Sequence, residues 1–197
     1  MIYDVAIIGN GILGSTLALE LYKLQKNLKK IIIGPKNKFG SASVASGAML
    51  NVFAEIEQDF INNQYLKKRF ELAVSALNIW KKHHRYIENH SKKKIELKWG
   101  TYVLNSARGT KFEDRLFEYL NKIVNLKNYK NFNSAITNPD NIKGLSPQAP
   151  HRPIRAIKVY DGFINSVQLL NAIDEILTKK KNINNFKNIV KKIKYKK

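Results

Sequence analysis

Three glycines close to the start of the chain have the spacing of a turn that binds phosphate groups. Gly9, Gly11 and Gly14 form the pattern G-x-G-x-x-G directly after the apolar run from Val5 to Ile8. In such a turn the first glycine permits the sharp change of direction, the second lets a pyrophosphate approach the backbone, and the third lets a helix pack closely on a strand. The start of that helix offers N–H groups and a partial positive charge to the phosphates. The residues predicted to bind a dinucleotide here are Gly9, Gly11, Ile12, Leu13 and Gly14.

A second segment with suitable chemistry follows at residues 40–50, where small residues dominate. Small side chains let the backbone approach a ligand, and each serine hydroxyl can donate or accept a hydrogen bond. Taken alone the segment is typical of a flexible linker, but beside the glycine motif it is predicted to contact the cofactor.

The residue that normally binds the ribose is missing from this sequence. Dinucleotide folds place an acid at the end of the second strand, about 20 residues past the glycines. Here that position falls on Gly34, followed by Pro35 and Lys36, and no Asp or Glu occurs between residues 21 and 54. Backbone groups, Lys36 or Asn37 are the alternatives for this contact, and Gly34 and Lys36 are included in the predicted site. Because a lysine also suits a 2′-phosphate, NADP stays open at this point.

The segments around the glycines predict the βαβ unit that must position them. Residues 3–8 and Ile31–Ile33 are apolar and rich in β-formers, which is typical of buried parallel strands. Between them, leucines recur at helical spacing through Lys26. We therefore expect a strand, a helix and a parallel strand joined by a right-handed crossover.

Apolar periodicity predicts further elements along the chain. Between residues 94 and 106 apolar and charged residues alternate, with a possible bulge at Gly100, whereas the flanking segments have helical spacing. The predicted elements are a helix over 55–89 interrupted near Asn62-Asn63, an extended segment over 94–106, a helix over 112–124, a turn at Asn138–Asn141, a strand over 154–160, a turn at Asp161-Gly162, a helix over 167–177 and a strand over 183–195.

Composition excludes several classes of protein. The chain has 197 residues, of which 44% are hydrophobic, so it is globular. It lacks cysteine, which removes disulfides and thiolate chemistry and fits a reducing compartment. No apolar run reaches the roughly 18 residues of a membrane span, and the apolar N-terminal stretch is interpreted as a strand rather than a signal peptide. We expect a cytoplasmic protein.

The net charge of +20 does not by itself identify a partner. The lysines are spread along the chain, and no aromatic–basic RNA motif or zinc-finger spacing accompanies them, so specific nucleic-acid binding is not predicted. His83, His84 and His90 match no common metal site, and no metal is predicted. No Ser-His-Asp arrangement, G-x-S-x-G elbow or phosphate-loop lysine occurs, which excludes hydrolases and NTPases of those types.

In these two cofactor segments the sequence resembles FAD-dependent oxidoreductases of the D-amino acid oxidase, glycine oxidase and sarcosine oxidase family. That family follows its second strand with a segment like G-x-S-x-x-(A/S)-x-G-M-L. Gly40, Ser43, Gly47, Met49 and Leu50 echo it, with Ala48 between the last glycine and the methionine. Residues 161–165 resemble a second family segment. The missing ribose acid is a departure, since the family normally has a Glu there.

The resemblance implies the fold and the cofactor. It implies an α/β protein (α+β overall), with a Rossmann-like FAD-binding βαβ unit and an inserted, incomplete substrate-domain sheet. The resemblance further implies that a second set of cofactor contacts lies along the pyrophosphate, ribitol and isoalloxazine of FAD, namely Gly40, Ser41, Ala42, Ser43, Ser46, Gly47, Ala48 and Met49. The predicted organisation is an FAD-binding part with a long helix over 1–90, part of a substrate domain over 91–160, and a return to the FAD-binding domain over 161–197. Since the family is almost twice as long, we expect a fragment, a truncated reading frame or one half of a split protein.

The resemblance also implies an activity, the oxidation of an amine or amino acid by hydride transfer from carbon to flavin, leaving an imine that water hydrolyses. Trp99 and Tyr102 are candidates to line a substrate pocket, although at least one of them is expected to pack against the sheet instead. Catalytic residues stay unassigned, since Tyr102 and His151 are candidates by residue type alone. Two other functions stay open: an inactive or split dinucleotide-binding module that needs a partner chain, possibly the missing C-terminal half, and an NAD(P)-binding protein.

Overall fold

The computed structural model describes residues 2–38, 40–57, 59–60, 62–132, 135–145 and 152–194. The chain divides into two compact units. Unit 1 comprises Met1–Ala48, Lys82–Glu96 and Ile164–Lys197, and unit 2 comprises Met49–Lys81 and Leu97–Phe163. The three-part domain organisation expected from the sequence stays a prediction.

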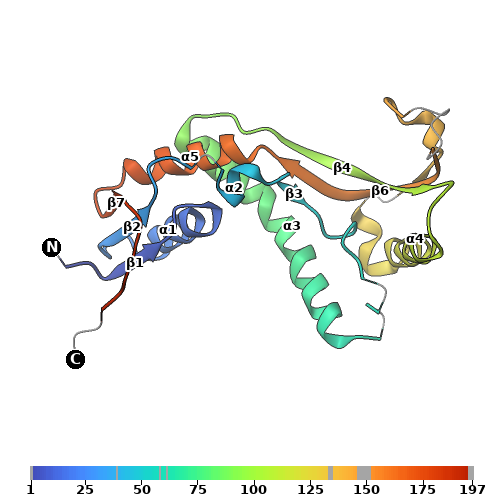
Figure 1. Ribbon diagram of the computed structural model, residues 1–197, viewed down its shortest axis with the longest axis horizontal. Helices are drawn as coiled ribbons and strands as arrows, with labels where there is room; N and C mark the ends of the chain where they lie inside the picture. Colours follow the sequence, from blue (N-terminus) through green and yellow to red (C-terminus); the bar gives the residue numbers. More distant parts are fainter. Residues whose placement is uncertain are drawn as a thin grey trace. The chain divides into compact units, whose positions relative to one another are not determined.

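Unit 1 is built on a three-stranded parallel sheet in the order β1-β2-β7 (Figure 1). Strand β1 (Val5–Ile8) runs beside β2 (Lys30–Gly34) with Val5 opposite Lys30, and β2 runs beside β7 (Ile183–Lys187) with Lys30 opposite Ile183. Helix α1 (Ile12–Leu24) connects β1 to β2. The predicted strand–helix–strand unit with parallel strands is therefore confirmed.

Helix α5 (Ser166–Thr178) packs against α1 in the same unit. It begins at Ser166 because the side-chain oxygen of Asn165 accepts a hydrogen bond of 3.0 Å from the N–H of Gln168, which caps the helix. Its buried face includes Leu169, Ile173 and Leu177. This apolar face supplies much of the core of unit 1.

A fully buried lysine binds the backbone that follows the C-terminal end of α1. The Nζ atom of Lys30, on β2, donates hydrogen bonds of 2.7 Å to the carbonyl of Gln25 and 3.0 Å to that of Leu28. Carbonyls beyond the last turn of a helix lack partners within it, so a positive donor stabilises them. Burial lowers the pKa of Lys30, while Asp4 opposes this effect.

Helix α3 (Gln64–Ser91) is shorter than predicted. The prediction of a helix from Glu55 is wrong, because the described residues between 51 and 60 form bends and turns. The side chain of Asn63 accepts hydrogen bonds from the N–H groups of Tyr65 (3.0 Å) and Leu66 (3.2 Å) and so sets the start of the helix. Phe60 is buried nevertheless, which explains why its spacing matched the helix pattern.

Unit 2 contains a sheet in the order β3-β6-β4 (Figure 1). Strand β5 also pairs with β6. Its strands are β3 (Met49–Leu50), β4 (Leu97–Ser106), β5 (Ala135–Thr137) and β6 (Pro153–Ile164). Helix α4 (Lys111–Val124) follows β4 and begins with a capping box between Thr110 and Glu113. The core gathers Phe53, Phe70, Leu77 and Phe117 with Ile157 of β6.

The predicted turn at Asp161-Gly162 is wrong, since both residues lie within β6. A Cβ atom on Gly162 would lie 2.7 Å from the ring of Trp99, so this glycine makes room for an aromatic side chain. A D-G pair commonly marks a turn, but here tertiary packing decides its conformation.

The remaining elements are short. They are helix α2 (Ala42–Ala45) and the 3₁₀ helices η1 (Lys127–Phe132) and η2 (Pro139–Asn141). The final strand ends at Lys187 rather than continuing toward Tyr195 as predicted, and Tyr195 lies outside the described residues. None of the helices in the described ranges is both long and apolar enough to cross a bilayer.

Candidate cofactor site

The turn between β1 and α1 requires its glycines. Gly9 has φ of +108°, in the region that favours glycine, and its N–H donates a 2.7 Å hydrogen bond to the carbonyl of Ile33. A Cβ on Gly14 would lie 1.9 Å from the carbonyl oxygen of Gly9. The helix therefore packs on the turn at a distance that only glycine allows.

The start of α1 is suited to a negative group. Gly11 precedes the helix in an extended conformation without a capping side chain, and the first turn contains no acid. N–H groups at this end of a helix have no partner within the helix, and the helix dipole adds a partial positive charge. The hydroxyl of Ser15, in the first turn of α1, donates a 3.0 Å hydrogen bond to the carbonyl of Asn10 and so holds the glycine turn against the helix.

Residues 40–48 reach this helix start through Ser43. Its Oγ accepts a hydrogen bond of 3.0 Å from the N–H of Ile12. A Cβ on Gly11 would lie only 3.0 Å from that same oxygen. The structure thus brings together two segments that the sequence assigned separately to the cofactor site.

The rest of this segment is held in unit 1 by two further features. Lys38 forms an ion pair with Asp174 of α5. The carbonyl of Ala48 accepts a 3.1 Å hydrogen bond from the N–H of Ile164, and Ala48 has φ of +46°, an uncommon conformation for a residue other than glycine. Such a backbone persists only where its surroundings hold it.

One polar atom of this segment is buried and has no hydrogen-bond partner in the described part of the chain. The Oγ of Ser41 has no hydrogen-bond partner among the described residues. Buried hydroxyls are normally satisfied, so this atom has capacity for a bound group. Met49, by contrast, belongs to unit 2, where it pairs with Phe163 of β6 in strand β3.

At the end of β2, the structure places a polar side chain that the sequence analysis did not include in the site, the amide of Asn10. Its Nδ2 donates a 2.9 Å hydrogen bond to the carbonyl of Pro35. A Cβ on Gly34 would lie 2.3 Å from its Cγ and 2.4 Å from its Oδ1. Lys36 is exposed beyond this point. No signal in the sequence singled out Asn10, because it is a variable position of the glycine motif.

The histidines of α3 have partners that are structural. His83 lies 3.3 Å from Glu20 of α1, and His84 lies 2.9 Å from the carbonyl of Ile95. Burial lowers the pKa of His83, and the charge of Lys23 adds to this effect while Glu20 opposes it. Within the described ranges no three His, Asp or Glu side chains gather as metal ligands.

In unit 2 the aromatic candidates have different surroundings. Trp99 stacks on Tyr160, with ring centroids 5.0 Å apart, and packs against the core. Tyr102 is 37% exposed, and Nζ of Lys158 lies 5.8 Å from its ring centroid. His151 lies outside the described residues. Neither Tyr102 nor Trp99 is assigned a catalytic role by these contacts.

A buried carboxylate, which the sequence indicated only as part of a turn, anchors the segment after β3. Asp161 is fully buried, and its carboxylate accepts hydrogen bonds from three consecutive N–H groups, those of Val52 (3.0 Å), Phe53 (3.0 Å) and Ala54 (2.8 Å). Burial raises the pKa of Asp161, and the three N–H groups partly offset this effect. Consecutive amides that converge on an anion form a nest.

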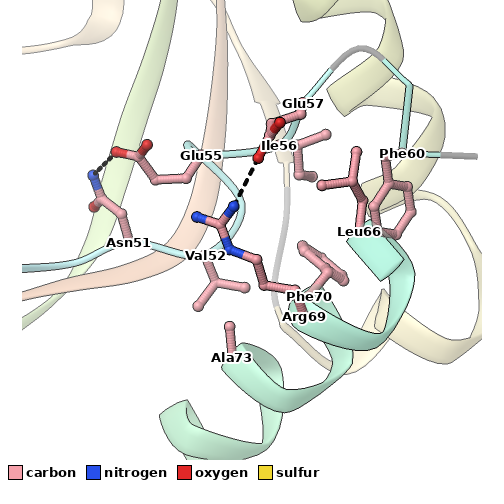
Figure 2. A pocket seen from close by; sticks show the side chains of 10 residues that line it. All are labelled: Asn51, Val52, Glu55, Ile56, Glu57, Phe60, Leu66, Arg69, Phe70 and Ala73. Carbon is pink, nitrogen blue, oxygen red and sulfur yellow. Dashed lines mark hydrogen bonds and ion pairs between the residues drawn. The ribbon is translucent and has the colours of Figure 1, made fainter. Parts of the chain in front are cut away.

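The anchored segment borders a cavity of about 120 Å³ in unit 2 (Figure 2). Its apolar lining residues are Val52, Ile56, Phe60, Leu66, Phe70 and Ala73. Four polar or charged residues also line it: Arg69 and Glu57 form an ion pair of 2.9 Å, and Asn51 donates to Glu55 at 3.4 Å. The cavity therefore combines an apolar surface with acidic and basic side chains that are already paired with one another (Figure 2).

The model of the family described as "FAD dependent oxidoreductase" (DAO) matches residues 4–183. Among curated protein sequences, none matches the chain. Solved structures with a similar fold include glycine oxidase from Bacillus cereus, with a TM-score of 0.74 and 21% identity over 99% of this chain and 49% of that one. Iminodiacetate oxidase from Chelativorans sp. has a TM-score of 0.68 and 18% identity over 92% of this chain and 46% of that one.

A third similar structure is L-alpha-glycerophosphate oxidase from Mycoplasma pneumoniae with FAD bound. Its TM-score is 0.61, with 16% identity over 93% of this chain and 44% of that chain. At these identities the structures establish the fold. In each case the chain spans about half the length of the protein that it matches.

Proposed function

The chain belongs to the FAD-dependent oxidoreductase family, and on that premise we propose that it supplies the FAD-binding part of an enzyme that oxidises the C–N bond of an amine or amino acid. The bound flavin would supply the acceptor for the hydride that leaves the carbon bearing the amine. The protein's part is to hold the cofactor and orient the substrate.

The observation that carries the proposal is the meeting of Ser43 with the start of α1. The hydroxyl of Ser43 bonds to the N–H of Ile12 beside Gly11, so residues 40–48 border the turn that dinucleotides use. A nicotinamide enzyme needs only the turn, whereas the FAD resemblance predicted both segments. This juxtaposition supports FAD over NAD(P).

The residues present fit the pyrophosphate portion of FAD. Apart from the N–H of Ile12, which donates to Ser43, the N–H groups at the start of α1 would face the phosphates, and no acid of the first turn opposes them. The buried Oγ of Ser41 lacks a partner in the described part of the chain and can donate to an anionic oxygen. The proposed contacts are Gly9, Gly11, Ile12, Leu13, Gly14, Gly34, Lys36, Gly40, Ser41, Ala42, Ser43, Ser46, Gly47, Ala48 and Met49.

The substrate class rests on the names of similar proteins. Glycine oxidase and iminodiacetate oxidase have amine substrates in their names, which supports an amine or amino acid. The oxidase named for L-alpha-glycerophosphate, which is not an amine, has a lower TM-score to this chain than either of these two. The location expected from the sequence, the cytoplasm, stays a prediction.

A second candidate function is a binding module completed by another polypeptide segment. Leu13, Leu17 and Leu24 on α1 are 85%, 50% and 80% exposed, and Ile8 on β1 is 54% exposed. Apolar side chains grouped in this way mark a surface that binds another protein segment. The segment would cover α1 and the side of β1 that has no neighbouring strand among the described residues. The module would bind FAD without oxidising an amine by itself.

The decisive experiment is the visible absorption spectrum of the purified 197-residue chain, recorded before dialysis and again after addition of FAD. A flavin spectrum that stays with the protein through gel filtration would support the cofactor. Bleaching by an amine or amino acid would then support catalysis, and stable absorbance across a substrate panel would favour the binding module. A chain that takes up reduced nicotinamide and no flavin would contradict the proposal.

A further inference from the structure

The side chain of Asn10 lies where a ribose-binding acid would stand in a dinucleotide fold. Such an acid ends the second strand about 20 residues past the glycines, which is the position of Gly34. An ideal Cβ on Gly34 would lie 2.8 Å from the Cβ of Asn10, 2.3 Å from its Cγ and 2.4 Å from its Oδ1. Side chains at both positions cannot fit, so Gly34 makes room for Asn10.

The orientation of this amide follows from its partner. The carbonyl of Pro35 accepts a 2.9 Å hydrogen bond from Nδ2. The reverse orientation would place two acceptors against each other, so Oδ1 is the oxygen turned toward Gly34. An amide oxygen has two lone pairs and can accept from a hydroxyl, as a carboxylate does.

We infer that Asn10 takes the place of the missing acid and accepts a hydrogen bond from a ribose hydroxyl of the adenosine part of FAD. This inference rests on the proposed function. Lys36 is a poorer candidate, because an ammonium group has no lone pair for a hydroxyl proton. A neutral amide also binds a hydroxyl less strongly than a carboxylate does.

The test uses the adenosine half of the cofactor by itself. Titration calorimetry would compare ADP with 2′,3′-dideoxy-ADP on the unmodified 197-residue chain. We expect the loss of both hydroxyls to weaken binding about tenfold. In Asn10→Gly the two ligands should bind equally, because the acceptor is gone. FMN lacks the adenosine part, so it serves as the reference ligand whose binding should not change in Asn10→Gly.

A double variant tests replacement directly. Asn10→Gly combined with Gly34→Glu restores an acid at the end of β2 and removes the clash, so discrimination between ADP and the dideoxy analogue should return. Asn37→Gly makes the same substitution at the asparagine that is the alternative for this contact, and it should keep the discrimination between the two ligands. Circular dichroism of each variant would verify that it folds.

The outcomes separate this inference from the proposed function. Equal binding of ADP and the dideoxy analogue by the unmodified chain would overturn the role of Asn10, whatever the variants do. Loss of discrimination in Asn37→Gly or Lys36→Ala but not in Asn10→Gly would overturn it as well. In either case the proposed function would stand if FAD still binds. A chain that binds neither ADP nor FAD would contradict both.

Discussion

The Oγ atom of Ser43 accepts a hydrogen bond of 3.0 Å from the backbone N–H of Ile12, 31 residues earlier in the chain. This bond caps the first turn of α1 from outside the helix, since Gly11 has no side chain to do so. It also holds residues 40–48 beside the helix start. One hydroxyl therefore connects the two segments that we propose to bind the cofactor.

Replacing Ser43 by Ala should weaken FAD binding about tenfold, because the acceptor for Ile12 is lost and residues 40–48 are no longer fixed at the helix start. Fluorescence titration with FAD measures the effect. Ser75→Ala is the control, since the Ser75 hydroxyl is exposed and bonds within its own helix to the carbonyl of Glu71. Equal affinities for the two variants would contradict the role of Ser43.

Gly14→Ala should abolish FAD binding at concentrations that saturate the unmodified chain. The new Cβ would lie 1.9 Å from the carbonyl oxygen of Gly9, so the helix must move away from the turn. Equilibrium dialysis with FAD is the measurement. Thr16→Ala, two residues later on the same helix, should keep the affinity of the unmodified chain, and retained binding by Gly14→Ala would argue against this geometry.

Asp161→Asn should destabilise unit 2 by about 1–3 kcal/mol, because the asparagine NH₂ would face the N–H of Ala54 where a carboxylate oxygen now accepts. Urea unfolding followed by tryptophan fluorescence reports the change, since Trp99 packs over Gly162 beside it. The matched control is Asp140→Asn at an exposed carboxylate. Equal stability of the two variants would show that the nest contributes nothing.

The pH dependence of that variant gives a further check. The pKa of Asp161 is raised above its ordinary value of 3.8 by burial, so the folded chain holds the proton more tightly than the unfolded chain. This group's contribution to the free energy of unfolding therefore decreases as the pH rises from about 3.8 through the higher folded pKa. Asp161→Asn should lack this component.

Acidification should destabilise unit 1 through His83. Burial, aided by Lys23, lowers the pKa of His83 below its ordinary value of 6.5. The unfolded chain then binds the proton more readily, so the free energy of unfolding is greatest above pH 6.5 and decreases as the pH falls through the lower folded pKa. Urea unfolding between pH 8 and pH 5 measures this loss.

His83→Gln should flatten that dependence, whereas His90→Gln, at an exposed histidine, should leave it unchanged. An identical pH profile for the unmodified chain and His83→Gln would assign the effect to another group. The comparison needs no cofactor, because the contact between His83 and Glu20 involves protein side chains only.

The sequence by itself determined the turn, the helix and the parallel strands that begin the chain. Gly9, Gly11 and Gly14 lie between an apolar strand and a helix with regular leucines, and these are local patterns that fix local geometry. The composition of residues 40–49 likewise identified a segment able to approach a ligand. Whether each predicted residue contacts FAD stays a prediction.

Only the tertiary structure decided which distant residues meet. Nothing in the sequence around Gly34 indicates that the amide of Asn10 occupies the space where a side chain at position 34 would lie. The pair Asp161-Gly162 indicated a turn, but Asp161 lies in a strand and accepts hydrogen bonds from amides 107–109 residues earlier in the chain. Periodicity reports the face that a residue presents, whereas hydrogen bonds across such separations depend on how whole elements pack.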